Sequence, residues 1–238
     1  MSVRDFTDRP VEDATVDAIL QAAFRAPTSS NIQAYSVVIV RDPEVRQKLY
    51  PITGNQKHIL TAPVFLAFCA DLTRIDEAFR RHGHSIESNN LEFGLVASID
   101  AALVGMSAYL CADSLGLKGV MIGAVRNDAV KTAEALGLPR HVYCVFGMCL
   151  GWPAKVPPQK PRMEYAGMVH YDQYGNQGDS SDLTGVVDRY DRDLAAHYES
   201  QGKPTAPDSW THEVDKKFSS GIRQGLREQL RKQGFDFT

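Results

Sequence analysis

Apolar and polar residues alternate over the first 150 positions in a way that predicts helices and strands in turn. Apolar residues recur every three or four positions from Val16 to Phe24, which is the spacing of one helix face, and Pro27 predicts its end. The β-branched run 35–42 predicts a strand. Residues 43–50 predict a short helix with proline at its first position. This alternation predicts a layered α/β or α+β core.

The middle of the chain combines a polar turn, a core strand and a long apolar helix. The donor-rich turn Gly54–His58 precedes the apolar run 63–70, which predicts a buried strand. Residues 72–90 are charged and predict an irregular surface segment. The stretch 91–115 predicts a helix whose apolar part is long enough to span a bilayer. Asp100 lies within it and favours a buried helix at a core or subunit interface, because a carboxylate at mid-bilayer is costly.

The character of the chain changes after Pro153. Before it, residues 116–128 predict a turn, a short strand and a turn, 129–139 a helix stopped by glycine and proline, and 141–153 a buried strand. After it, a proline-rich extended segment precedes two predicted helices, near 182–200 and 210–234. These helices cannot bury their apolar residues alone. We therefore expect a core at 1–153 and a C-terminal extension at 154–238 that packs on the core and on a partner subunit.

Composition excludes several classes of protein without naming a function. The 238 residues carry a net charge of −3 and no basic cluster, which argues against a nucleic-acid or anionic-membrane partner. The N-terminal residues lack an apolar signal-peptide core. The four cysteines occur without a CxxC pair, so we expect reduced thiols in a cytoplasmic protein. The close pair His82 and His84 has no completing ligands, and we expect no metal site.

The usual catalytic motifs are missing, but groups that can bind anions or hydrogen-bond to the amide groups of a ligand are spread along the chain. There is no G-x-S-x-G, H-E-x-x-H, phosphate-binding P-loop or G-x-G-x-x-G. Arg4, the turn Thr28–Asn31, the turn Gln56–His58, the small residues of "IGAVRND" and the segment "KPR" carry such groups. Each one alone is better explained as an ordinary polar turn or surface charge.

Taken in order, the segments resemble one family. The stretches "SVRDFTDRPV", "APTSSNIQAYSVVIVRD", "GNQKHILTAPVFLAFCAD", "LGLKGVMIGAVRND" and "VFGMCLGWPAKVPPQKPR" resemble the FMN-dependent nitroreductases, in the oxygen-insensitive NAD(P)H nitroreductase and flavin reductase branch. The resemblance implies an α+β fold with a central, mostly antiparallel sheet surrounded by helices. It also implies a homodimer whose C-terminal extensions wrap the partner and whose FMN sites draw on both chains.

The resemblance also implies a set of cofactor-binding residues. Arg4 and Arg162 would hold the FMN phosphate, and Lys160 would lie near the N1/O2 edge of the ring, where a cation stabilises reduced flavin. No side chain is expected to act as an acid or base. The full set of expected FMN contacts is Ser2, Val3, Arg4, Thr28, Ser29, Ser30, Gln56, Lys57, His58, Ile122, Gly123, Ala124, Lys160 and Arg162.

The implied reaction is a ping-pong hydride transfer. A reduced nicotinamide, NADH or NADPH, would pass hydride to flavin N5, and nitroaromatics, quinones or free flavin would then accept it. Two other functions remain open: a flavin-binding protein without turnover, and a flavin reductase supplying a partner monooxygenase.

The sequence departs from the family at two places. Relatives usually carry a His-Arg pair before the position of Ser2, and its absence from this sequence predicts weaker FMN affinity. NADPH-preferring relatives have arginines where this chain has Gln201, Ala206 and Pro207, leaving Lys203 as the nearby cation. We therefore expect NADH to be used at least comparably with NADPH.

Overall fold

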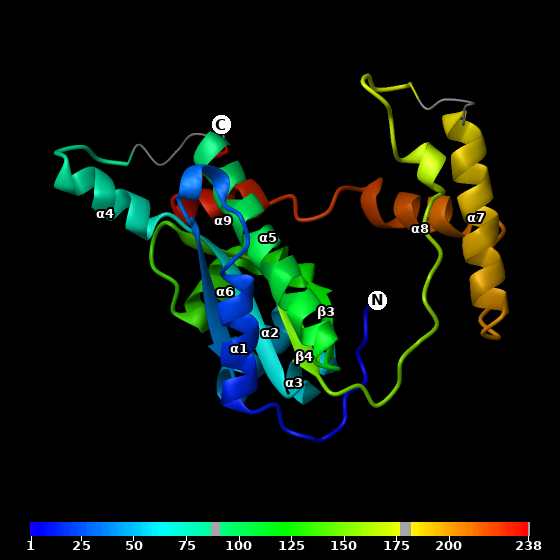
Figure 1. Cartoon of the computed structure of the whole chain (residues 1–238), viewed down its shortest axis with the longest axis horizontal. Helices are drawn as coiled ribbons and strands as arrows, with labels where there is room; N and C mark the ends of the chain where they lie inside the picture. The colour runs from blue at the N-terminus through cyan, green and yellow to red at the C-terminus, as the bar shows by residue number, and fades with distance from the viewer. Residues whose placement is uncertain (87–90, 177–181, 238) are drawn as a thin grey trace. The chain divides into compact units, whose positions relative to one another are not determined.

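The computed structural model describes residues 1–86, 91–176 and 182–237, and the chain forms two compact units (Figure 1). The first unit comprises Met1–Pro157 and Arg223–Thr238, and the second comprises Pro158–Ile222. The last part of the chain therefore packs on the core. The predicted boundary after Pro153, and the packing of the extension on a partner subunit, stay predictions.

A four-stranded antiparallel sheet forms the centre of the first unit. Its strands are β1 (Tyr35–Val40), β2 (Val64–Asp71), β3 (Lys118–Ile122) and β4 (Val142–Gly151), in the order β1-β2-β4-β3. All three neighbouring pairs are antiparallel. Every residue of β2 is buried, which fits its unbroken apolar sequence. The sheet and the helices around it confirm the predicted α+β fold.

Helices cover both faces of this sheet (Figure 1). On one face, α1 (Asp13–Ala23) packs beside the long helix α5 (Leu91–Ser114). On the other face lie α2 (Pro43–Ile52), the short α3 (His58–Thr61) and α6 (Ala129–Leu136). Alternate residues of β2 point to the two faces, so Phe68 packs under α1 and α5, and Phe65 packs under α2 and α3.

The predicted helix boundaries are set by caps. Asp42 accepts a hydrogen bond from the Glu44 amide at 2.8 Å where α2 begins, and Asp128 accepts from the Lys131 amide at 3.0 Å where α6 begins. Gly137 ends α6 with a φ of 64°, a left-handed conformation that glycine adopts without steric cost. The helix predicted at 91–115 is confirmed as Leu91–Ser114.

Two sequence predictions were wrong in detail, and the short helix α3 was not predicted. Within 72–90, Thr73–Arg81 forms helix α4, with Ile75 and Phe79 one turn apart against the core. The polar turn at 54–58 does not run directly into β2, because α3 lies between them. The helix predicted at 210–234 is two helices, α8 (Ser209–Phe218) and α9 (Leu226–Lys232), which belong to different units.

The C-terminal segment closes one end of the core. Gln233 accepts a hydrogen bond from the His141 amide at 2.7 Å, just before β4. The ring of Phe235 lies 4.7 Å from that of Tyr143, measured between centroids, in an edge-to-face arrangement. Leu230 of α9 is buried in the same cluster. These contacts explain why the last residues group with the first unit.

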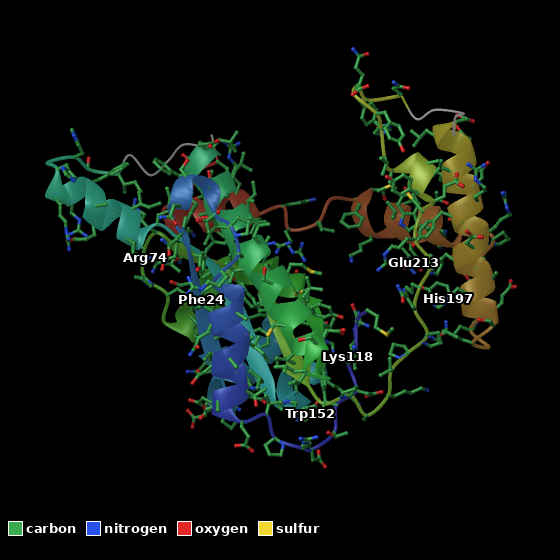
Figure 2. All side chains as sticks on the ribbon, viewed as in Figure 1. Phe24, Arg74, Lys118, Trp152, His197 and Glu213 are labelled. Carbon is green, nitrogen blue, oxygen red and sulfur yellow. The ribbon has the colours of Figure 1, made fainter. Side chains whose placement is uncertain are left out.

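The second unit is built on α7 (Leu183–Glu199) and α8, which carry His197 and Glu213 (Figure 2). The carboxylate of Asp191 on α7 accepts from the Trp210 amide at 2.6 Å and the Thr211 amide at 3.0 Å. It therefore satisfies amides of the first turn of α8 and ties the two helices together. A 3-10 turn, η3 (Tyr165–Gly167), precedes them.

Helix α5 is the one helix, among the described residues, that is long and apolar enough to cross a membrane. This is weak evidence for a membrane span, because core helices of soluble proteins have the same length and composition. Its inner face packs against the sheet, and Asp100 on that face is fully buried in protein.

Candidate functional site

The N-terminal segment runs along β3 and presents two polar side chains. Val3 is fully buried, and its amide donates to the Gly119 carbonyl of β3 at 3.0 Å. In extended chain, neighbouring side chains point to opposite sides, so Ser2 and Arg4 are exposed. Among the predicted FMN contacts, Val3 can therefore offer only its main chain.

The segment is held further along by an aromatic side chain. The guanidinium carbon of Arg9 lies 3.8 Å from the centroid of the Trp152 ring, which is labelled in Figure 2. The Trp152 indole nitrogen donates to the Pro10 carbonyl at 3.1 Å, and the Thr7 amide donates to the Trp152 carbonyl at 2.9 Å. These bonds fix the chain that follows Arg4 to the end of β4.

The turn Gln56–His58 lies in the same region. The Gln56 side-chain nitrogen donates to the Thr53 carbonyl at 2.7 Å, and Lys57 is exposed. His58 is buried, and its Nε2 atom has no hydrogen-bond partner among the described residues. Burial, followed by the nearby charge of Arg4, lowers the pKa of His58. An unpartnered buried nitrogen beside a guanidinium is suited to a ligand that brings hydrogen-bond acceptors.

A buried arginine makes this turn rigid. Arg46 on α2 is 5% exposed and donates to the Val40 carbonyl at 2.9 Å and the Pro63 carbonyl at 3.3 Å. It also donates to the Ala62 carbonyl, at the end of α3. Burial lowers the pKa of Arg46. Its guanidinium ties the end of β1 to the segment between α3 and β2, and so holds His58 in place.

The end of β3 forms a third part of the site. Ile122 is buried, and Gly123 and Ala124 are half-buried where η2 (Gly123–Asp128) begins. A Cβ atom at Gly123 would lie 3.5 Å from the guanidinium of Arg126, an ordinary contact. The packing of the chain therefore does not itself require glycine, which leaves close approach by a ligand as a reason for it.

Two arginines beside Gly123 were not among the predicted contacts. Arg126 donates to the Val145 carbonyl, and Arg223 donates to Asn127 Oδ1 at 3.0 Å. Burial, followed by the charge of Arg126, lowers the pKa of Arg223, so the two cations lie close to one another. Arg126 belongs to the quoted "IGAVRND", but Arg223 is about 100 positions away, and only the fold brings the two together.

The predicted turn Thr28–Ser30 lies elsewhere in the unit. It precedes β1, whose first residue Tyr35 pairs with Ala70 at the far end of β2. Arg4 and His58 lie at the other end, where β2 begins at Val64. Six residues of strand separate the two ends, which is about 20 Å. One chain therefore does not bring this turn to Arg4 and His58.

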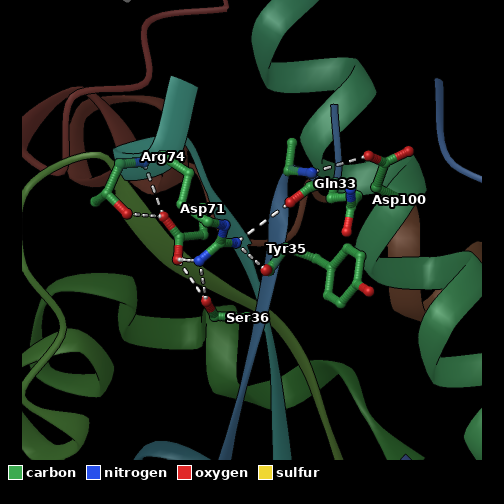
Figure 3. A network of polar contacts seen from close by, with 8 residues as sticks. Gln33, Tyr35, Ser36, Asp71, Arg74 and Asp100 are labelled. Carbon is green, nitrogen blue, oxygen red and sulfur yellow. Dashed lines mark hydrogen bonds and ion pairs between the residues drawn. The ribbon is translucent and has the colours of Figure 1, made fainter. Parts of the chain in front are cut away.

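The turn itself is anchored by carboxylates and an arginine (Figure 3). Asp100 of α5 accepts from the amides of Ser29 and Ala34, while Arg74 donates to the carbonyls of Gln33 and Tyr35. The turn is thus a defined structure with exposed Ser29 and Ser30.

Lys160 and Arg162 belong to the second unit. The Lys160 ammonium donates to the Tyr198 hydroxyl at 2.5 Å and lies 4.9 Å from the centroid of its ring. Arg162 donates to the Pro161 carbonyl at 2.9 Å. Both side chains are exposed and lie on one segment of extended chain.

The residues near β3 fit a phosphate-bearing aromatic cofactor. The exposed guanidinium of Arg4 and the unpartnered nitrogen of His58 suit an anion. Gly123 and Ala124 are small, so a ring can approach their main chain closely, beside the cationic Arg126. No cluster of three or more metal-ligating side chains occurs in residues 1–86, 91–176 and 182–237.

Family models match both parts of the chain. The Nitroreductase family model matches residues 1–152, and the model "Nitroreductase family, C-terminal domain" matches residues 160–238. The chain belongs to the nitroreductase family. The predicted resemblance is thus confirmed, together with the fold.

Nitroreductase-family relatives match over nearly their whole length. The chain is 38% identical over 237 residues to an oxygen-insensitive NADPH nitroreductase of Salmonella typhimurium, covering 98% of this chain and 94% of the relative. It is 35% identical to an NAD(P)H FMN reductase of Bacillus subtilis, covering 98% and 94%.

Solved structures agree with this assignment. A nitroreductase of Bacillus subtilis superposes with a TM-score of 0.93 at 30% identity, covering 100% of this chain and 96% of that one. The NADPH:FMN oxidoreductase of Vibrio harveyi, solved with NAD⁺, superposes with a TM-score of 0.87 at 32% identity, covering 100% and 96%.

Proposed function

We propose that this nitroreductase is an FMN-dependent NAD(P)H oxidoreductase that reduces nitroaromatics, quinones or free flavin. The observation that carries the proposal is the cluster of Arg4 and the unpartnered His58 at one end of the sheet, in a chain that matches both nitroreductase domains. Bound FMN supplies the hydride chemistry. The protein supplies binding, orientation and positive charge.

The residues near β3 divide the binding of FMN among them. Arg4 and Ser2 hold the phosphate and ribityl chain, and His58 adds its free nitrogen on that side. Gln56 hydrogen-bonds the pyrimidine or ribityl edge, supported by Lys57. The main chain of Ile122, Gly123 and Ala124 meets the ring.

Cations outside this cluster complete the site. Lys160 and Arg162 approach the same cofactor, Lys160 at the ring and Arg162 at the phosphate. Arg126 and Arg223 add positive charge beside Gly123, which favours an electron-rich flavin and an anionic or electron-poor acceptor.

We infer a homodimer whose flavin sites draw on both chains. The outer face of α5 exposes a stripe of large apolar residues at helical spacing: Leu95 43%, Ile99 54%, Leu103 39%, Met106 48% and Leu110 57%. An apolar stripe on a soluble protein marks an interaction surface. A second copy covering it would also let Thr28–Ser30 of one chain reach the flavin bound by the other, which a single chain does not allow.

Steady-state kinetics test the proposed function. With FMN-loaded protein, parallel double-reciprocal lines for NADH against a nitroaromatic are expected, because the two substrates use one surface in turn. A purified protein that binds FMN but oxidises no NADH or NADPH with any acceptor would contradict it. A higher kcat/KM for free FMN than for a nitroaromatic would identify a flavin reductase.

The coenzyme preference follows from the loop between α7 and α8. Lys203 there donates to Gln201 Oε1 at 3.1 Å and lines a cavity of about 630 Å³ with Thr205, Ala206 and His212. A 2′-phosphate is held best by arginine, and the described part of this loop has none. We expect NADH to be used at least comparably. A kcat/KM ratio above about 100 in favour of NADPH, which is about 2.7 kcal/mol, would contradict this.

The cellular location stays a prediction. Cys69, Cys144 and Cys149 are buried thiols, Cys111 is half-buried, and none forms a disulfide. Burial raises the pKa of the Cys149 thiol to about 12, which keeps it protonated and unreactive. This supports a reducing compartment such as the cytoplasm.

A further inference from the structure

The turn before β1 has an unusual backbone that something must hold in place. Ser30, Asn31 and Gln33 all have positive φ angles, of 46°, 55° and 50°. None of them is glycine, and non-glycine residues in the left-handed region cost free energy unless their surroundings enforce it. Such strain accumulates at functional sites, and this turn carries the two exposed serines of the proposed flavin site.

A single buried carboxylate, Asp100, holds both ends of the strained segment, and Figure 3 shows it with one of its two bonds. Asp100 Oδ1 accepts from the Ser29 amide at 3.1 Å, and Oδ2 accepts from the Ala34 amide at 3.0 Å. Asp100 is 0% exposed, and no ion pair joins it to a basic side chain in the described part of the chain. Its charge is therefore compensated by these two amides, and the amides have no acceptor if it is lost.

The opposite side of the segment is held by a second, more exposed group. Arg74 donates to the Gln33 carbonyl at 3.3 Å and to Asp71 Oδ2 at 3.1 Å. Burial would raise the pKa of Asp71, but hydrogen bonds from Ser36 and Thr73 and the charge of Arg74 lower it, so the carboxylate stays ionised. Arg74 fixes the exit of the turn, whereas Asp100 alone bridges its beginning and end.

We propose that Asp100 is a positioning residue for flavin binding, which holds the turn Ser29–Ala34 in the strained shape that presents Ser29 and Ser30 to FMN. The inference rests on the proposed function. It gives the buried carboxylate of the apolar helix α5 a role that neither a core position nor an interface position explains. Asp100 touches neither cofactor nor substrate. It acts through the backbone of the turn.

The Asp100→Asn variant tests this directly, because it keeps the shape of the side chain but turns one acceptor into a donor facing an amide. We expect amide hydrogen exchange to become faster in residues 28–36 and to stay unchanged in α5. The FMN dissociation constant should rise about 10- to 100-fold, the effect of losing a hydrogen bond to a charged group. The control Asp113→Asn removes a carboxylate from the same helix, one that pairs with Lys118 outside the turn, and should change neither.

Each outcome decides the inference. Unchanged FMN affinity in Asp100→Asn would overturn it, even if the melting temperature falls, because a purely structural residue affects only the folded fraction. Weaker FMN binding without faster exchange in residues 28–36 would also overturn it. If Asp100→Asn does not fold, Asp100→Glu, which shifts both oxygens by one methylene, should show the same two changes. Wild-type protein that binds no FMN would refute the proposed function instead, and the exchange result would then decide whether Asp100 holds the turn.

Discussion

The two units differ in how much of their structure they support by themselves. The first unit has a sheet covered on both faces, and its central strand is buried at every residue. The second unit is a pair of helices after a long extended segment, and it exposes large side chains such as Tyr165 at 70% and Tyr174 at 89%. The first unit is thus a rigid scaffold. The second exposes large side chains of the kind that another surface covers. The proposed flavin contacts are divided between them.

The largest expected effect is on the scaffold. Phe65→Ala empties a fully buried position under α2 and α3, and we expect the free energy of unfolding to fall by about 3–5 kcal/mol. Leu194→Ala in α7 should cost less, about 2 kcal/mol, because the helix pair can collapse around the gap. Urea unfolding measures both. An equal or larger loss for Leu194 would mean that the second unit is as well packed as the first.

The next effect concerns the exposed apolar stripe on the first unit. Ile99→Glu places a charge in the inferred dimer interface, and we expect association to weaken by about 3 kcal/mol. Light scattering coupled to size-exclusion chromatography should show a monomer with reduced FMN occupancy. The control Ser114→Glu adds the same charge at the exposed end of α5 and should leave a dimer. A dimeric Ile99→Glu variant with full occupancy would refute the shared site.

A smaller effect is expected from the second unit. Arg162→Ala should weaken FMN binding by about 2 kcal/mol while leaving a folded dimer, because a charge-assisted bond to phosphate is lost. Flavin fluorescence titration measures the affinity. Arg189→Ala is the matched control, since Arg189 is an exposed arginine of the same unit that pairs with Glu164. Full flavin loading of the Arg162 variant would refute its phosphate role.

The smallest effect is a pH dependence of the scaffold. Burial and Arg4 hold the pKa of His58 below its ordinary value of 6.5. The unfolded chain therefore binds more protons below pH 6.5, so the stability of the FMN-free protein should fall as the pH is lowered through that window. The slope is at most about 1.4 kcal/mol per pH unit for this group. The urea midpoint should be measured between about pH 5 and 7, where histidine titrates. Its dependence on pH should be shallower for His58→Gln than for the unchanged protein.

Two other groups must be separated from His58 in that experiment. Burial, followed by Arg140, also lowers the pKa of His141, so His141→Gln is the parallel variant. Asp71 loses its stabilising charge only below its ordinary pKa of 3.8, outside this window. A slope unchanged in His58→Gln would show that the imidazole is not held neutral at the site.

The sequence predicted the scaffold well and the site only in part, for physical reasons. The strands and α5 are mostly apolar, and the local hydrophobic pattern identifies them. Helix α4 was missed because charged residues surround its short apolar pair, Ile75 and Phe79, although that pair has helical spacing. The break between α8 and α9 falls at Ser219–Gly225, where Gly221 has a φ of 74°, and amphipathic spacing on both sides concealed it.

The site residues missed by sequence reasoning act over long separations. Arg126 and Arg223 become neighbours only because α9 packs beside η2. Asp100 was recognised only as a residue unsuited to a membrane, and its partners Ser29 and Ala34 lie 71 and 66 positions away. No local pattern connects them.

The most direct test of the central claim is an anaerobic titration of the FMN-loaded protein with NADH. We expect the yellow colour to bleach with stoichiometric NADH and to return when a nitroaromatic is added. Protein that holds FMN and remains yellow with both NADH and NADPH would contradict it, and would identify a flavin-binding protein without turnover.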